Sequence, residues 1–197
     1  MPLFMQGDRI ADEAGHTWAA VSHVNPLDVG FPVAGPQRIV AWTGWYGDES
    51  EPAAGLFPRD FRTWTPRAWE ALRSRIEAAA ESRPSTGELL LRPHSRHVIP
   101  DPQACVMLLK DLPQGVGILL DPVSMLTPDM LPAAEDHIAR ALEIAAFPRI
   151  AGVLIAGAER IGDDQIGPTA AGMALPRETV RALADRRAPG VRQIVLA

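Results

Sequence analysis

The sequence is poor in several residue types that would point to particular classes of protein. It has one cysteine, Cys105, in 197 residues, so no disulfide can form within the chain and a reducing, cytoplasmic location is expected. No apolar run approaches the roughly 18 residues of a membrane-spanning helix, so no membrane partner is predicted. The first residues lack the basic-then-apolar layout of a secretory signal.

Lysine is almost absent, because Lys110 is the only one and arginine carries nearly all the positive charge. This bias is typical of a GC-rich, bacterial genome. With 19 basic residues against 24 acidic ones, the formal net charge is −5. An acidic chain without a run of basic residues is not expected to bind nucleic acid.

What remains is an ordinary globular composition, with 47% hydrophobic residues. A chain of this length is expected to form a single domain, here residues 1–197, with a core large enough to need no disulfide or metal. Proline is abundant at 19 residues. The prolines stand between apolar runs, so they delimit elements of secondary structure.

Short apolar runs alternate with amphipathic runs along most of the chain. The apolar runs predict strands at 17–24, 38–42, 88–91, 116–120, 151–156 and 191–196. Apolar spacing and capping residues predict helices at 65–83, 101–112, 132–147 and 176–187, with residues 1–15 as a helical lead-in. Cys105 falls in the second helix and is expected to be buried and structural.

Strands that are apolar throughout are typical of a parallel sheet with helices on its faces. Two architectures then remain, a doubly wound sheet or a (β/α) barrel. A doubly wound nucleotide-binding domain needs a glycine-rich loop after a strand, whereas Gly115 and Gly117 lie at the start of one. The sequence therefore favours the barrel.

In a parallel barrel the functional residues gather at the carboxyl ends of the strands. Trp45 follows the strand at 38–42. The candidates after the next two strands are Arg92, His94 and His97, then Asp121 and Ser124.

Three motifs carry a resemblance to a known family. The strand and turn at 88–94 (ELLLRPH), the strand at 115–122 (GVGILLDP) and the loop at 166–176 (IGPTAAGMALP) resemble those of the xylose-isomerase-like TIM barrels. That family includes sugar and sugar phosphate isomerases, epimerases and family-2 AP endonucleases. The resemblance implies a TIM-type barrel from residue 17 onwards, incomplete and missing its first strand. An unpaired edge of this kind predicts a homodimer.

The family typically holds a divalent cation (Mn, Mg or Zn) with a Glu, an Asp, a His and a second Glu from four strand ends. Here Arg92 stands where the first Glu is expected, and Asp121 matches the Asp. Leu154 and Ala197 stand where the His and the last Glu would be. A guanidinium repels a cation, so no metal cofactor is expected, and Asp121 is the one matched ligand. His94 and His97 leave a substitute metal site open as an alternative.

The candidate roles follow from this resemblance and from the residue types. Asp121 and His94 are the candidate catalytic acid and base, and the candidate substrate-binding residues are Arg92, Trp45, Ser124 and His97. The structural alternatives are an ion pair between Arg92 and Asp121, solvated loop histidines and a packing role for Trp45. Asp163 and Asp164 are expected to be solvated.

Two hypotheses for the function follow. The first is a divergent isomerase/epimerase-like barrel that binds a small polyhydroxy or anionic ligand; any surviving activity would be proton transfer next to a carbonyl. The second is a catalytically inactive barrel that acts as a binding or protein-interaction module.

Overall fold

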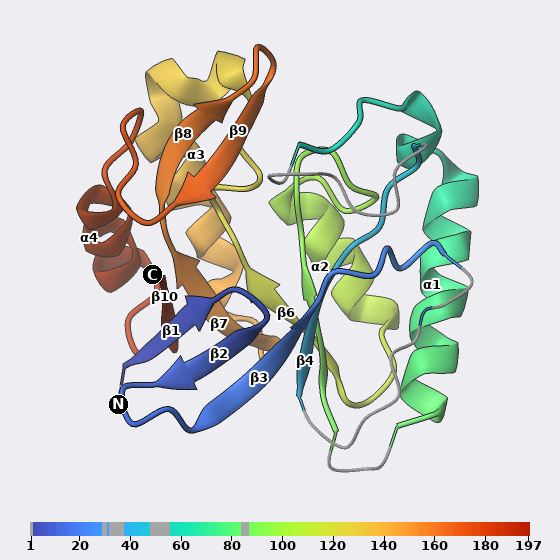
Figure 1. Cartoon of the computed structure of the whole chain (residues 1–197). Coiled ribbons are helices and arrows are strands. Elements are labelled where there is room, and N and C mark those ends of the chain that lie inside the picture. Colours follow the sequence, from blue (N-terminus) through green and yellow to red (C-terminus); the bar gives the residue numbers. More distant parts are fainter. Residues whose placement is uncertain (1, 29–30, 32–37, 48–55, 84–86) are drawn as a thin grey trace.

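Eight strands close into a barrel (Figure 1). The computed structural model describes residues 2–28, 31, 38–47, 56–83 and 87–197. Around the barrel the strands follow the order β1 (Leu3–Gln6), β10 (Gln193–Leu196), β7 (Ile150–Ile155), β6 (Val116–Leu120), β5 (Leu89–Arg92), β4 (Ile39–Trp42), β3 (Thr17–Ser22) and β2 (Arg9–Asp12). The predicted TIM-type α/β barrel is confirmed.

The N-terminal segment forms a β-hairpin, so the prediction of a helical lead-in is wrong. β1 and β2 pair antiparallel, and Gly7 at φ 56° lies in the tight turn between them. The burial of alternate side chains explains why this segment forms strands rather than a helix. Leu3, Met5 and Ile10 are buried in the barrel, while Phe4 lies on the other face. A period of two is the pattern of a strand.

This hairpin also corrects the expectation of an incomplete barrel. β1 pairs parallel with β10, and β2 pairs antiparallel with both β1 and β3, so no barrel edge is left open. β2 is the one barrel strand that runs against the others. The unpaired edge that motivated the expected homodimer is therefore absent from the described barrel, and the homodimer stays a prediction without that support.

Four α-helices of the described chain cover the outside of the barrel. They are α1 (Pro66–Glu81), α2 (Pro102–Asp111), α3 (Ala134–Leu142) and α4 (Arg177–Arg187). The predicted caps are confirmed, since the Thr65 and Asp101 side chains accept hydrogen bonds from the third residue of α1 and α2. α3 is shorter than predicted, because 3₁₀ segments η3 (Pro128–Ala133) and η4 (Glu143–Ala146) replace its ends. No helix among the described residues is long and apolar enough to span a membrane.

Two hydrophobic clusters hold the layers together. The barrel interior is filled by one buried residue or more from each strand: Leu3, Met5, Ile10, Ala19, Val40, Leu90, Leu119, Leu154 and Ile194. The alternate residues of the strands point outward and pack against the helices in a larger cluster. Cys105 is fully buried in this cluster, as predicted. A filled interior leaves only the ends of the barrel for a ligand.

A second hairpin lies outside the barrel and was not predicted. It consists of β8 (Gly157–Ile161) and β9 (Gln165–Thr169), which pair antiparallel. The hairpin begins two residues after β7 ends, and in Figure 1 it projects at the top of the molecule, across from α1 and α2. It therefore adds a wall at the end of the barrel where the parallel strands finish.

Candidate functional site

The six predicted site residues do come together at the carboxyl ends of β4, β5 and β6. Arg92 is the last residue of β5, and Asp121 directly follows β6. All six side chains are buried, with Arg92 the most accessible at 7% exposure. The residues therefore form a packed cluster, which we call the mouth cluster: Trp45, Arg92, His94, His97, Asp121 and Ser124.

An ion pair between Arg92 and Asp121 lies at the centre of the mouth cluster. Nε and Nη2 of Arg92 donate to Oδ2 of Asp121 at 2.8 and 2.7 Å. The guanidinium also lies over the ring of Trp42, with Cζ 4.1 Å from its centroid, in a cation–π contact. Arg92 thus forms the ion pair with Asp121 that the sequence analysis gives as its structural alternative.

Ser124 occupies the remaining acceptor positions of the same carboxylate. Its backbone N–H donates to Oδ1 of Asp121 at 3.1 Å, and its hydroxyl donates to Oδ2 at 2.6 Å. Asp121 is fully buried and is held by a guanidinium, a hydroxyl and a backbone amide. Charge-assisted hydrogen bonds of this kind are the strong ones in proteins, so the carboxylate is fixed in place.

His94 and His97 lie in an aromatic cluster rather than on a solvated loop. His97 stacks on Trp45, with ring centroids 5.1 Å apart and an interplanar angle of 22°, and both histidine rings pack against Phe57. Burial, with Arg92 and Arg96 nearby, lowers the pKa of His94 to about 3; burial and His94 lower the pKa of His97 well below its usual range. Both imidazoles are therefore neutral at pH 7.

The two histidines differ in their hydrogen bonds. Nδ1 of His94 accepts from the backbone N–H of Arg96 at 3.0 Å. Neither ring nitrogen of His97 has a hydrogen-bond partner among the described residues. An imidazole that is fully buried without partners costs stability, so His97 is an unusual feature of the mouth cluster.

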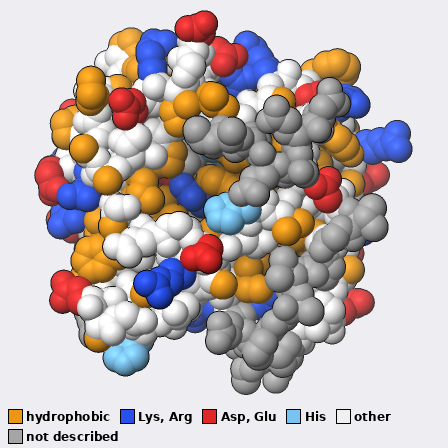
Figure 2. Space-filling model, viewed as in Figure 1, with side chains coloured by type: hydrophobic (Ala, Val, Ile, Leu, Met, Phe, Trp, Pro, Cys, Tyr) orange, Lys and Arg blue, Asp and Glu red, His pale blue; other side chains and the backbone are white. Residues whose placement is uncertain are grey.

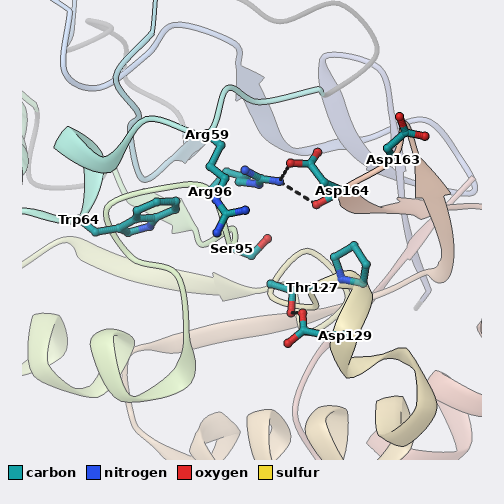
Figure 3. Close-up of a pocket in the computed structure, with 9 residues that line it drawn as sticks. Arg59, Trp64, Ser95, Arg96, Thr127, Asp129, Asp163 and Asp164 are labelled. Carbon is teal, nitrogen blue, oxygen red and sulfur yellow. Dashed lines mark hydrogen bonds and ion pairs between the residues drawn. The ribbon is translucent and has the colours of Figure 1, made fainter.

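An open cavity lies beside the mouth cluster, on the same end of the barrel (Figure 3). It measures about 430 Å³ and is lined by loop residues that follow β4, β5, β6 and β8: Arg59, Trp64, Ser95, Arg96, Thr127, Pro128, Asp129, Asp163 and Asp164. None of these residues was predicted as part of a site. We call it the loop cavity.

The mouth cluster supports the inner wall of the loop cavity. The His94 ring fixes the backbone of Arg96, and the backbone N–H of Ser95 donates to the carbonyl of Ser124 at 2.8 Å. The site residues that the sequence predicts thus lie beneath the residues that line the loop cavity.

The loop cavity combines opposite charges with an aromatic wall. Arg96 is 6% exposed, and its Nη2 donates to the carboxylate of Asp164 at 2.6 Å and to the Asp164 carbonyl at 2.7 Å. The Arg96 guanidinium lowers the pKa of that carboxyl. Asp164 is thus solvent-accessible, as expected, but it also ties the β8–β9 turn to the loop after β5. Trp64, from the 3₁₀ segment η2 (Phe61–Trp64), is 42% exposed at the other end.

The described residues do not fit a divalent cation at the mouth cluster. They contain no group of three or more His, Cys, Asp or Glu side chains that could hold a metal ion. Both oxygens of Asp121 already accept hydrogen bonds, and Arg92 places a positive charge against one of them. Mg²⁺ and Mn²⁺ need several oxygen ligands with net negative charge.

No protein-family model and no curated protein matches the chain. Among solved structures it is similar to a xylose isomerase-like TIM barrel protein from Mycobacterium smegmatis in complex with magnesium, at 14% identity and a TM-score of 0.46, over 82% of this chain and 54% of that one. It is also similar to a D-psicose 3-epimerase in the presence of D-fructose (16%, 0.42, 81% and 50%) and to mannonate dehydratase from Streptococcus suis serotype 2 (15%, 0.45, 81% and 54%). The chain spans about half the length of these proteins. All three likenesses concern the barrel fold alone, and they transfer no residue role to this chain.

Proposed function

We propose that this chain is a ligand-binding barrel of the xylose-isomerase-like type that works without a metal ion and without isomerase or epimerase chemistry. Its ligand is a small polyhydroxy or anionic compound held in the loop cavity. The observation that carries the proposal is the ion pair between Arg92 and Asp121, at strand ends where the resemblance implies that the family holds its cation.

The proposed loss of catalysis follows from the state of the two candidate acid–base groups. A general base must reach the substrate proton and have a pKa near the working pH. Asp121 is buried and accepts hydrogen bonds from the Arg92 guanidinium and from the hydroxyl and backbone N–H of Ser124. His94 is 1% exposed, with a pKa of about 3. Neither group is placed to take a proton from a bound sugar.

The proposed ligand class follows from the lining of the loop cavity. Sugar hydroxyls both donate and accept hydrogen bonds, and the lining offers guanidinium donors, carboxylate acceptors and the hydroxyls of Ser95 and Thr127. Trp64 offers an exposed ring on which the apolar face of a small molecule can pack. In Figure 2, positive and negative side chains are interspersed over the face shown, which supports a small polar ligand rather than a polyanion.

We expect at least one compound from a panel of sugars, sugar acids and sugar phosphates to raise the melting temperature. At a ligand concentration about 100 times the dissociation constant, the gain is about 2.7 kcal/mol, or roughly 5–10 °C for a chain of this length. Differential scanning fluorimetry measures it. Trp64→Ala should abolish most of the shift. Phe147→Ala, which truncates a similarly exposed ring outside the cavity, should leave the shift intact.

A panel without any effect would contradict ligand binding and favour the second hypothesis, a protein-interaction module. One observation supports that alternative. Phe61 is 78% exposed on η2, three residues before Trp64. Exposed aromatic side chains that lie together mark interaction surfaces.

A further inference from the structure

The charges that line the loop cavity are unevenly matched. Arg96 and Asp164 form an ion pair within the lining. In Figure 3, Asp163 points outward, away from the other labelled side chains. This leaves Arg59 and Asp129 as the two charged groups that face the cavity without an ion pair among the described residues.

Arg59 and Asp129 lie across the cavity from each other in Figure 3, with Arg59 between Trp64 and Asp164. Both are exposed. Hydrogen bonds from the Thr127 hydroxyl and from its own backbone N–H lower the pKa of Asp129. His137 and then Arg59 add smaller electrostatic effects in the same direction. Arg59 also contributes to the lowered pKa of Asp164. The carboxylates are therefore charged at pH 7, and the cavity has a positive side and a negative side.

The overall charge of the lining bears on which ligand fits. With the outward-pointing Asp163 left aside, two arginines face two aspartates, so the charged groups that face the cavity carry no net charge. A phosphate monoester brings a charge of about −1.5 to −2, and it would meet the carboxylate of Asp129 as well as the arginines. A ligand without net negative charge avoids this repulsion.

We propose that the loop cavity takes a zwitterionic compound, whose acidic group pairs with Arg59, whose ammonium group pairs with Asp129, and whose apolar part packs on Trp64. This inference rests on the proposed function, because it concerns the ligand of the same cavity, and it replaces a simple anion there with an acid that also carries an amine. A guanidinium binds a carboxylate in a bidentate fashion, and a carboxylate across the cavity fixes the position of an ammonium group.

The experiment compares three probes that share one apolar group. L-phenylalanine carries both charges, L-3-phenyllactate lacks the ammonium group and 2-phenylethylamine lacks the carboxylate. Isothermal titration calorimetry measures each dissociation constant. Phenylalanine should bind at least about tenfold more tightly than either partial probe, because each of these leaves one charged group of the cavity unpaired.

Two variants assign the charges to their residues. Arg59→Gln should bring phenylalanine and phenylethylamine to equal affinity, and Asp129→Asn should do the same for phenylalanine and phenyllactate. The matched controls are Arg67→Gln on α1 and Asp136→Asn on α3, which remove exposed charges outside the cavity lining and should leave all three affinities unchanged.

The outcomes separate this inference from the proposed function. Equal binding of phenylalanine and phenyllactate overturns the zwitterion and leaves a simple anion site. Binding of D-gluconate without binding of any phenyl probe also overturns it, while the proposed polyhydroxy ligand stands. If neither D-gluconate, nor the rest of the sugar panel, nor phenylalanine binds, both proposals fail together.

Discussion

Arg92→Met should lower the free energy of unfolding by about 3–5 kcal/mol, because it leaves the buried Asp121 carboxylate without its counter-charge. The carboxylate is fully buried, so solvent does not replace the lost guanidinium. A typical domain unfolds with about 5–15 kcal/mol, so this one substitution removes a large part of the total. Urea unfolding at pH 7 measures the change.

A double substitution separates the ion pair from ordinary packing. In Arg92→Met combined with Asp121→Asn, the amide oxygen can still accept the hydrogen bond from Ser124, and no unpaired charge remains. The double variant should therefore be more stable than Arg92→Met alone. The control is Arg73→Met, which breaks an exposed ion pair with Glu77 on α1 and should cost less than about 1 kcal/mol. An Arg92→Met variant no less stable than this control would contradict the proposed role of the ion pair.

Acid should destabilise the protein well before its carboxylates titrate. The pKa of His94 is about 3 and that of His97 is also lowered by burial, whereas both titrate near 6.5 in the unfolded chain. Well above pH 6.5 both histidines are neutral in both states, and the free energy of unfolding then falls as the pH drops below 6.5, because only the unfolded state binds the protons. Between pH 6.5 and 5 the two histidines together should cost about 3 kcal/mol.

His97→Phe tests that origin, because it removes one of the two titrating groups and keeps an aromatic ring against Trp45. The loss of stability between pH 6.5 and 5 should fall to about half. At pH 7 the variant should be more stable than the parent by about 1 kcal/mol. The buried histidine ring carries two nitrogens without hydrogen-bond partners among the described residues, and the substitution replaces it with an apolar ring. Urea midpoints across this pH range give both numbers. An unchanged pH dependence in the variant would mean that other groups take up the protons.

The sequence predicts the parallel part of the fold well, because its strands and helices have strong local signals. The runs at 116–120 and 151–156 are continuously apolar, and Thr65 and Asp101 cap helices with a proline in the next position. The N-terminal hairpin was missed although the apolar alternation of Leu3, Met5 and Ile10 surrounds a Gly-Asp turn. The resemblance to a family of larger barrels placed the start of the fold at residue 17.

The site is less predictable, because a strand end shows where a side chain starts but not what it contacts. Arg92, Asp121 and His94 were correctly placed together at the barrel end. Packing between strands decides the rest: it pairs Arg92 with Asp121 and buries both, so that other residues line the accessible cavity. Arg59 and Asp164 approach each other only because the β8–β9 hairpin folds over the barrel end. Arg59 and Asp164 are about a hundred residues apart in the chain, so no local sequence pattern predicts that they lie close together.

The most direct test of this account is the metal content of the protein, purified without chelators, by inductively coupled plasma mass spectrometry with the protein quantified in parallel. With Arg92 bound to Asp121, we predict manganese, magnesium, zinc and iron far below one equivalent per chain. The same low content is predicted after incubation with excess Mn²⁺ and desalting. Near-stoichiometric metal would contradict the account, because it would show that the mouth cluster rearranges into a working cation site.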